Sequence, residues 1–307
     1  MAKAFSIASW NVEHFKEDPS RIDRIVTFLA VQNPDLLALY EVEGKDVFAS
    51  VTAKFPGYTF HITEGEESQE ILVGVRASLS AFLTQKLEFK SGATSMRPGL
   101  MATVTVAGKP YCVLFLHLAS SNEPRGFGLR DDMATRAIKF RKPLDASAGG
   151  KANYLFLGDL NTMGLDYPYQ KEIDPLTELK KWDLQASRFY DMRRLVKAYD
   201  ASWSNGSGSS IPDSNLDHVY ASNHLKFKLF TRADGAKAEV DVRGWTDQTS
   251  AAAKDKWIKD YSDHSLSISK SSECETDPFA PASAREFADF LFEFCTAFPC
   301  NEARAVA

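Results

Sequence analysis

Cysteine is scarce in this chain of 307 residues, which contains only Cys112, Cys274, Cys295 and Cys300. Their spacing matches none of the close Cys and His pairs that hold structural zinc, and this excludes a zinc-binding module of that kind. Cys112 lies inside the apolar run YCVLFLHL, so we expect it in the core. A disulfide among the other three cysteines stays open.

Long apolar runs and a surplus of positive charge are also missing. No stretch approaches the roughly 18 to 20 apolar residues that span a bilayer, and the start MAKAFSIASWNV has no signal-peptide hydrophobic region. We therefore expect a soluble cytoplasmic protein, with a secreted protein as the alternative if a leader was removed. The net charge of −5 and the pI of about 5.8 argue against binding nucleic acid through bulk positive charge, although a bound divalent cation can supply charge locally.

Three common catalytic motifs are absent as well. The sequence has neither a P-loop nor a G-x-G-x-x-G dinucleotide fingerprint, and the lack of G-x-S-x-G gives a serine hydrolase little support. Any catalytic chemistry has to come from other polar residues.

What the sequence does contain is a regular series of short apolar runs. These runs predict strands, several of them buried on both faces: FSIASWNV, DLLALYEV, EILVGVR, LMATVTVAG, YCVLFLHLA, NYLFLGD, LDHVYAS, LKFKLF and HSLSIS. Helical patterns occur at residues 18–34, 123–144 and 187–199. The alternation predicts an α/β fold of layered mixed sheets with helices outside.

We expect one large domain over residues 1–270 and a C-terminal extension over residues 271–307. The Gly/Ser-rich segment 202–215 is predicted as a loop inside the domain, because strand patterns continue on both sides of it. In the extension, AREFADFLFEFCTAF has apolar residues at helical spacing, which predicts one amphipathic helix. We expect that helix to pack on the domain, with docking to a partner as the alternative; no stable protein partner is predicted.

Polar residues mark the points where the predicted strands begin or end. They are Asn11, Glu41, His117, Asp159, Asn161, Asp217, Asp263 and His264. Taken singly, each has an ordinary explanation: Asn11 can begin a turn, Glu41 can cap a helix and His117 can be a hydrogen-bonded core histidine. Because ligand sites form at strand ends in layered α/β proteins, we expect the set to meet at one mouth.

Asp159 and Asn161 stand two residues apart in LFLGDLNTMG, where an apolar run stops at Gly158. If the backbone stays extended through Leu160, both side chains point to the same side. Carboxylate and amide oxygens suit Mg²⁺ or Mn²⁺, and histidines beside carboxylates suit general acid–base catalysis. Metal-assisted hydrolysis of a phosphate ester fits this inventory best, because the cation screens an anionic substrate and stabilises charge that develops at phosphorus.

A series of motifs in a fixed order resembles the endonuclease/exonuclease/phosphatase superfamily, which has the DNase I-like fold. The motifs are SWNVEHF, LALYEVEG, MRPG, LHLAS, LGDLN, LDHVY and SDHSL, and the resemblance runs from about Phe5 to Ile268. It implies a four-layer α/β/β/α sandwich of two mixed sheets flanked by helices. It also implies a phosphodiesterase that depends on Mg²⁺ or Mn²⁺.

The resemblance implies roles for individual residues. Asn11 and Glu41 would hold the divalent cation, with Glu41 as the principal ligand. Asp263 would assist at the metal or hold its neighbour. Asp159 would orient or deprotonate the attacking water, and Asn161 would hydrogen-bond a phosphate oxygen.

A second group of implied roles concerns proton transfer and the substrate phosphate. Asp217 would pair with and orient a histidine, and His264 would bind the scissile phosphate and share its charge. In the DNase I-like branch, a histidine at the LHLAS position, here His117, pairs with a glutamate, for which Glu70 is the candidate. That pair resembles a general acid and its orienting carboxylate. Arg97 in MRPG matches an arginine that contacts substrate phosphate.

Two features depart from the family pattern. Members often read SDH, then a small residue or Cys, then Pro, whereas this chain has Ser265 and Leu266. This difference at the entry to a strand leaves the role of His264 in place. Residues 228–261 are longer than a minimal connection and lie next to the predicted mouth, so they bear on substrate choice.

The resemblance favours a DNase I-like nuclease with a nucleic acid substrate, DNA first. A phosphatase, or a lipid phosphodiesterase acting on a sphingomyelin or phosphoinositide headgroup, is the alternative within the same fold. A non-catalytic binding member is the alternative from another class, and it has less support because none of the matched polar positions is lost. The sequence does not decide whether the substrate is DNA, RNA or lipid, or whether cleavage is endonucleolytic or exonucleolytic. It also leaves open which metal is used in the cell.

Overall fold

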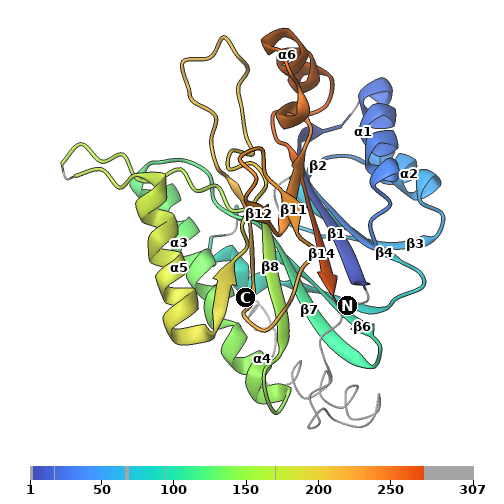
Figure 1. Ribbon diagram of the computed structural model, residues 1–307, viewed down its shortest axis with the longest axis vertical. Helices are drawn as coiled ribbons and strands as arrows, with labels where there is room; N and C mark the ends of the chain where they lie inside the picture. The colour runs from blue at the N-terminus through green and yellow to red at the C-terminus, as the bar shows by residue number, and fades with distance from the viewer. Residues whose placement is uncertain (1–2, 17, 66–68, 94, 170, 273–307) are drawn as a thin grey trace, which may run out of the picture.

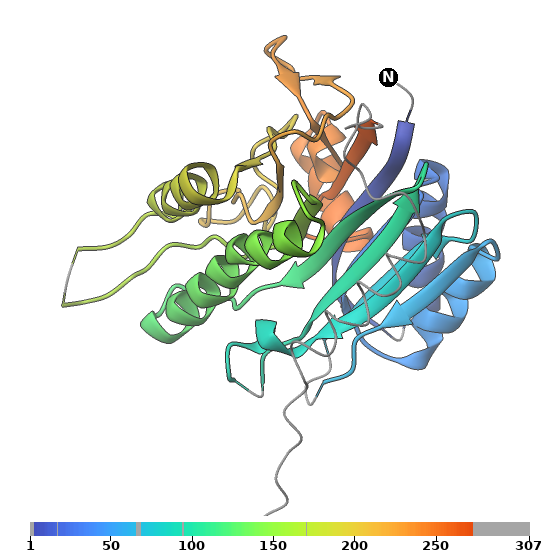
Figure 2. The ribbon, with the colours of Figure 1, turned by 90° about the horizontal axis from the view of Figure 1, so that it is seen from below.

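The computed structural model describes residues 3–16, 18–65, 69–93, 95–169 and 171–272, which form two packed sheets with helices on both outer faces (Figures 1 and 2). This arrangement confirms the predicted four-layer α/β/β/α sandwich. No helix in these ranges is long and apolar enough to cross a membrane.

The strands of the first sheet follow the order β13-β14-β1-β2-β4-β3. Their bounds are Lys3–Phe15 (β1), Leu36–Val42 (β2), Tyr58–Ile62 (β3), Glu70–Arg76 (β4), Val240–Arg243 (β13) and Leu266–Ser272 (β14). β1 runs parallel to β2 and antiparallel to β14. The end of β1 therefore lies beside the end of β2 and the start of β14.

The second sheet has the order β5-β6-β7-β8-β10-β9. Its strands are Ser80–Lys86 (β5), Gly99–Val106 (β6), Lys109–His117 (β7), Asn153–Asp159 (β8), Met192–Arg194 (β9) and Asp217–Ser222 (β10). β7 and β8 are parallel, and β10 is antiparallel to β8. A small separate ribbon pairs β11 (Phe230–Thr231) with β12 (Lys237–Ala238).

The helices lie outside the two sheets (Figure 1). On the outer face of the first sheet lie α1 (Pro19–Gln32) and α2 (Lys45–Lys54). On the outer face of the second sheet lie α3 (Pro124–Lys139), α4 (Arg141–Ser147) and α5 (Pro175–Tyr190). The remaining helices are α6 (Ala251–Asp260) and the 3₁₀ turns η1 (Leu87–Lys90) and η2 (Trp245–Asp247).

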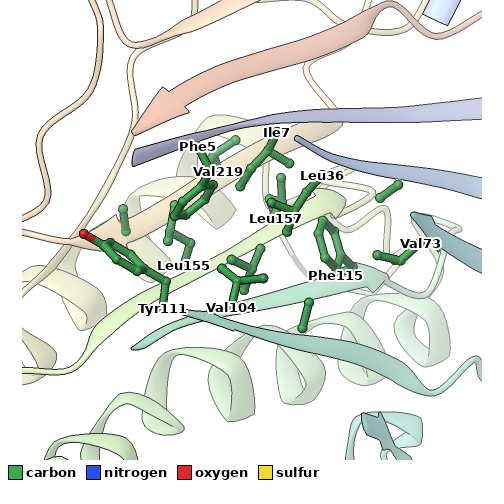
Figure 3. Packing of buried hydrophobic residues seen from close by; sticks show 14 of the residues in the cluster. Phe5, Ile7, Leu36, Val73, Val104, Tyr111, Phe115, Leu155, Leu157 and Val219 are labelled. Atoms are coloured by element: carbon green, nitrogen blue, oxygen red, sulfur yellow. The ribbon is translucent and has the colours of Figure 1, made fainter. Parts of the chain in front are cut away.

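The main core lies between the two sheets and contains apolar side chains from both (Figure 3). Alternation along the strands separates this core from the outer ones: in β8, Leu155 and Leu157 face the other sheet, whereas Tyr154 and Phe156 face the helices. Strands with apolar residues on both faces explain the continuous apolar runs of the sequence. Cys112 is buried in the outer core, as expected.

Two of the predicted helices are confirmed and one is wrong. The pattern at 18–34 forms α1, and the pattern at 123–144 forms α3 and α4. Of the pattern at 187–199, only residues 187–190 are helical, because they are the end of α5, which begins earlier, where Asp174 caps its first turn. Asp191 then adopts a left-handed conformation with φ 48°, and the chain turns into the short strand β9.

Residues 228–261, unexplained by the sequence, contribute structure beside the first sheet. Their strand β13 extends that sheet by pairing with β14, and they also contain α6. The run LKFKLF, expected as a strand, enters regular strand structure only at Phe230. The segment 202–215 is a loop, as predicted. The expected C-terminal helix and Cys274, Cys295 and Cys300 lie outside the described residues, and the domain boundary at 270 stays a prediction.

Candidate active site

Six of the predicted site residues converge at one edge of the two sheets. They come from the ends of β1, β2, β7 and β8, from the start of β10 and from the turn before β14: Asn11, Glu41, His117, Asp159, Asp217 and His264. Parallel neighbours end at the same edge, and antiparallel neighbours begin there, so the topology alone brings these positions together.

The amide of Asn11 joins the two sheets at this edge. Its Nδ2 donates to Glu41 Oε1 at 3.0 Å, across the first sheet, and to Asp159 Oδ2 at 2.9 Å, in the second sheet. Its Oδ1 accepts the backbone N–H of Glu13 at 3.0 Å. Asn11 is buried, so it fixes the separation of two carboxylates that would otherwise repel each other.

Asp159 and Asn161 form a turn rather than an extended segment. The backbone N–H of Asn161 donates to Asp159 Oδ1 at 3.0 Å, and Asn161 has a left-handed φ of 50°. The expectation of an extended backbone through Leu160 is therefore wrong. The side chain of Asn161 is buried and donates to the carbonyl of Leu118 at 3.1 Å, in the loop that follows β7.

Asp217 and His264 form a buried pair. His264 Nδ1 lies 2.8 Å from Asp217 Oδ2, and the other ring nitrogen lies 3.7 Å from Asp159 Oδ2. The backbone of Asp217 is held on both sides, because its N–H donates to Ser202 Oγ at 2.9 Å and its carbonyl accepts from Lys197 Nζ at 2.9 Å. Lys197 and Ser202 are supporting residues that no sequence motif indicated.

The pKa values of His264 and Asp159 are both raised, by different causes. Burial, the largest effect on His264, lowers its pKa, but the carboxylates of Asp217 and Asp159 outweigh it and raise the pKa to about 10. Burial raises the pKa of Asp159 to about 6, with a further increase from Asp217 and opposition from the charge of His264 and the hydrogen bond from Asn11. At neutral pH His264 is thus an imidazolium beside two carboxylates.

His117 lies between the carboxylates of the two sheets. Its Nε2 is 3.6 Å from Asp159 Oδ2 and 3.8 Å from Glu41 Oε1, and its Nδ1 is buried without a hydrogen-bond partner. Burial, followed by the positive charges of Arg97 and His264, lowers the pKa of His117 well below its usual value. The ring is therefore neutral at neutral pH.

The predicted pairing of Glu70 with His117 is not made in this structure. Glu70 accepts a short hydrogen bond from Thr63 Oγ1, and burial raises its pKa. Glu70 opens β4 in the first sheet, where Thr63 holds its carboxylate, and His117 ends β7 in the second sheet. Arg97 donates to the backbone and side-chain oxygens of Gln69, the residue that precedes Glu70.

Asp263, predicted to assist at a metal, points to a different set of partners. Its Oδ2 accepts from Trp203 Nε1 at 2.6 Å. The pKa of Glu13 is raised, first by burial and second by the nearby carboxylate of Asp263. Glu41 adds a smaller increase, and the positive charge of Arg21 opposes it. Glu13 thus lies between two predicted metal ligands and was missed, although its place two residues after Asn11 was visible in SWNVEHF.

The backbone around the site is strained. Positive φ angles occur at four residues that are not glycine: Glu13 (43°), His14 (44°), Glu41 (61°) and Asn161 (50°). Residues held in such conformations cost roughly 1 to 3 kcal/mol each and tend to cluster at functional sites. Here they aim Glu41 and Asn161 into the shared edge.

The donors fit a hard divalent cation. Glu41, Asn11 and Asp159 offer carboxylate and amide oxygens, the ligand type that Mg²⁺ and Mn²⁺ prefer. Asp159, Asp217 and His264 also present ligand atoms within 4.8 Å of one another. Because His264 is bonded to Asp217 and protonated at neutral pH, its ring is a poor ligand there, and the side of Glu41 and Asn11 fits a cation better.

Comparison with known proteins gives one family and several similar structures. The model of the Endonuclease/Exonuclease/phosphatase family matches residues 8–264. Tyrosyl-DNA phosphodiesterase 2 from Xenopus tropicalis is 24% identical over 159 residues, which cover 51% of this chain and 40% of that protein. The match therefore spans less than half of the curated relative's length.

Two solved structures illustrate the shared fold. TDP2 from D. rerio, complexed with a single strand DNA product, has a TM-score of 0.60 at 15% identity and covers 88% of this chain and 99% of that one. The human Nocturnin catalytic domain with a bound sulfate anion has a TM-score of 0.58 at 15% identity, covering 88% and 93%. At these identities the likeness concerns the fold.

Proposed function

Because this chain belongs to the endonuclease/exonuclease/phosphatase family, we propose that it is a divalent-cation-dependent phosphodiesterase that cleaves DNA. The observation that carries the proposal is the buried arrangement of Asp159, His264 and Asp217 beside the linked pair Asn11 and Glu41. This arrangement combines a base, a fixed positive charge and oxygen ligands within one small volume.

Asp159 is the proposed base for the attacking water. With a pKa of about 6 it is ionised at neutral pH, yet it is basic enough to take a proton from a water molecule held beside it. Hydrogen bonds from Asn11 and Asn161 fix both carboxylate oxygens, so only the remaining lone pairs can receive the water. Asn161 is the proposed donor to a phosphate oxygen.

His264 is the proposed partner of the scissile phosphate. Its imidazolium is held by Asp217 through Nδ1, which leaves Nε2 to donate towards a phosphate oxygen. A fixed positive charge in a buried site stabilises the negative charge that develops in the transition state without reorganisation. Asp217 keeps the ring in orientation and keeps it charged.

Glu41 and Asn11 are the residues that would hold Mg²⁺ or Mn²⁺, with Glu13 and Asp263 as neighbouring carboxylates. When bound, the cation supplies positive charge against the substrate phosphate. Glu41 has a side chain that is 16% exposed, so a cation can reach it from solvent. For Asn11 to act as a ligand, its Oδ1 must serve a cation as well as the N–H of Glu13.

His117, Glu70 and Arg97 have supporting places in the proposal. A neutral His117 can donate one hydrogen bond to a substrate or leaving-group oxygen, and burial, with the charges of Arg97 and His264, lowers its pKa and so keeps the ring neutral. Glu70 is proposed to support the rim where Arg97 contacts a flanking phosphate. Arg97 suits that role because a guanidinium matches phosphate geometry.

DNA is the proposed substrate because two similar proteins point to it. The curated relative is named a tyrosyl-DNA phosphodiesterase, and the D. rerio structure contains a single strand DNA product. A divalent cation at the site compensates for the chain's net charge of −5.

The test is hydrolysis by the full-length chain with Mg²⁺ or Mn²⁺. We expect EDTA-sensitive cleavage of single-stranded DNA or plasmid, and a fall of about 10²- to 10⁴-fold or more in kcat for Asp159→Asn and His264→Ala. Asp132→Asn, on the exposed face of α3, is the matched carboxylate control and should leave activity unchanged.

Retained activity in both Asp159→Asn and His264→Ala would overturn the site assignment. Cleavage of RNA, or of sphingomyelin or phosphoinositide headgroups, without cleavage of DNA would contradict the proposed substrate. Bis-p-nitrophenyl phosphate serves as a small phosphodiester that reports the chemistry without any macromolecular contact.

A further inference from the structure

A projecting arm leaves the site directly after the Asp159–Asn161 turn. We define the arm as residues 163–169 and 171–174; in Figures 1 and 2 it extends beyond α3 and α5, away from the sheets. Its two sides pair through Leu165 N–H to Ile173 O at 2.7 Å and Ile173 N–H to Leu165 O at 3.0 Å. The two sides of the arm are thus paired, as in a hairpin, at Leu165 and Ile173.

The root of the arm is fixed by a buried ion pair between α3 and α5. Arg130 Nε donates to Glu178 Oε1 at 2.8 Å, and both side chains are fully buried. Gly164 is held by both partners, since its N–H donates to Glu178 Oε2 at 2.9 Å and its carbonyl accepts from Arg130 Nη2 at 2.9 Å. Gly164 has φ +73°, and a Cβ there would lie 2.2 Å from the carbonyl oxygen of Ile173.

The same arginine ties the arm to the loop that follows His117. Arg130 Nη1 donates to the carbonyls of Ala119 and Ser121 at 3.1 and 2.8 Å. In addition, the N–H of Asp166 donates to the carbonyl of Asn122 at 2.8 Å. The root of the arm is therefore fixed relative to the strand ends that form the candidate site.

The far part of the arm contains two tyrosines, of which Tyr169 is exposed and Tyr167 is partly buried. Tyr169 is 84% exposed, and its ring contacts that of Tyr167 edge to face, with centroids 5.6 Å apart. Exposed aromatic rings that project from the domain offer flat faces on which a ligand can stack. Tyr167 lies six residues after Asn161, which limits its distance from that residue to about 22 Å.

We propose that Tyr167 and Tyr169 stack unpaired bases of a single-stranded nucleic acid whose phosphodiester bond is held at Asp159 and His264. The proposal rests on the proposed function and names the form of its substrate. Aromatic side chains on a firm support are a general means of binding single strands, because every base has a face to stack. A strand that runs from the site along the arm meets these rings several nucleotides from the cleaved bond.

The composition of the arm favours nucleic acid over a lipid surface. Between Asp166 and Glu172 the sequence is DYPYQKE, with tyrosines, a proline and charged residues but no aliphatic side chain. Insertion into a membrane needs apolar side chains, whereas tyrosine combines a stacking face with a polar tip. Lys171 supplies one positive charge in this segment, against the two carboxylates of Asp166 and Glu172, so the stacking faces and not the charge carry the argument.

The test uses the full-length chain with Tyr167→Ala and Tyr169→Ala combined. We expect KM for a 12-nucleotide single-stranded DNA to rise about tenfold or more, with kcat little changed. Hydrolysis of bis-p-nitrophenyl phosphate should be unchanged, because that substrate is too small to reach the arm. Tyr167→Phe with Tyr169→Phe should keep wild-type KM, since stacking does not need the hydroxyl groups.

Phe189→Ala provides the control, because Phe189 is 74% exposed on the distant end of α5. An unchanged KM for DNA in the double alanine variant would overturn the proposal. An equal loss on bis-p-nitrophenyl phosphate would overturn it too, because the substitutions would then act by distorting the site. Loss of binding to phospholipid vesicles, with binding of DNA intact, would assign the arm to a membrane instead.

A binding measurement separates failure of this proposal from failure of the proposed function. Fluorescence anisotropy of a labelled 12-mer on the Asp159→Asn protein, with and without the two alanine substitutions, reports the arm without any need for cleavage. If the wild-type chain cleaves no nucleic acid but the alanine substitutions weaken this binding tenfold, the binding role of the arm is confirmed and the proposed catalytic function is wrong. If the two alanine substitutions leave Kd unchanged, or if neither protein binds the 12-mer, the proposed role of the arm is wrong.

Discussion

Asp159 carries a cost in stability that follows from its surroundings. Burial raises its pKa from 3.8 to about 6, so the folded protein binds this proton more tightly than the unfolded chain does. A raised folded pKa contributes stability that is complete below the unfolded value and is lost as the pH rises through the folded value. The window for Asp159 therefore runs from about pH 4 to pH 6, and above it the ionised carboxylate destabilises the fold.

Asp159→Asn should accordingly stabilise the protein while abolishing its activity. With EDTA present, we expect the Tm of the variant to exceed that of the wild type by about 2 °C or more at pH 8, because the amide has no charge to desolvate. At pH 5 most of the wild-type Asp159 is already protonated, so the difference should vanish. Thermal unfolding at the two pH values checks this; a Tm difference that is independent of pH, or a lower Tm at pH 8, would contradict it.

The positions of single residues were predictable where strand topology decides them. Asn11, Glu41 and Asp217 stand at strand ends, and the order of motifs was enough to bring them to one edge. The partner of His117 was not predictable, because it depends on how the two sheets are placed across their interface. Glu13 was not predicted for a related reason. Its backbone and that of His14 are both left-handed, and no sequence pattern indicates this conformation in residues other than glycine.

At the scale of elements, the contact between α3 and α5 contains one fully buried ion pair. Arg130 and Glu178 are both fully buried, and their hydrogen bonds satisfy each other and the root of the arm. Buried pairs add little stability compared with apolar residues, but removing one partner leaves an uncompensated charge. The pair therefore makes the position of the arm specific.

Glu178→Ala should lower the free energy of unfolding by about 3 to 5 kcal/mol, since it strands the guanidinium of Arg130. Asp132→Ala removes a pair of the same chemistry, with Arg136, that is exposed on α3 and should cost no more than about 1 kcal/mol. Urea unfolding at pH 7 measures both. Equal losses in the two variants would show that burial of the pair has no consequence.

Helices were predictable where the sequence signals their ends. Asp18 and Pro19 announce α1, and the structure has the cap at Asp18 as the pattern suggests. The same signal, Asp174 followed by Pro175, opens α5, whereas the apolar spacing at residues 187–199 predicts a helix beyond the point where α5 ends. A local pattern of apolar residues did not reveal that Asp191 ends the helix, because a left-handed residue other than glycine leaves no clear mark in the sequence.

At the scale of the whole molecule, the last described strand, β14, is an inner strand of the first sheet. β14 lies between β13 and β1, so it holds β13 in the sheet and covers one side of β1. The layered fold as a whole was predictable from the runs and their order. The extension of the sheet by β13 was not, because residues 240–243 are too few to stand out as a strand.

Truncation should separate the domain from the extension. A chain ended after Ser272 keeps every strand described here, and we expect its Tm and activity to match those of the full-length protein within about 2 °C and twofold. A chain ended after Asp260 lacks β14 and His264 and should show no cooperative thermal transition. Calorimetry of both checks this; loss of the transition on removing residues 273–307 alone would contradict the predicted boundary.

The pairing of β1 with β14 also sets when a working site can exist during translation. The indole of Trp10 bonds the carbonyl of His264 across 254 positions in the chain. Because translation adds about 5 to 20 residues per second, β14 is synthesised roughly 13 to 50 seconds after β1. Until then the carboxylates of Glu41, Asp159 and Asp217 have emerged but the imidazolium of His264 has not, so the candidate site is incomplete while most of the chain is already made.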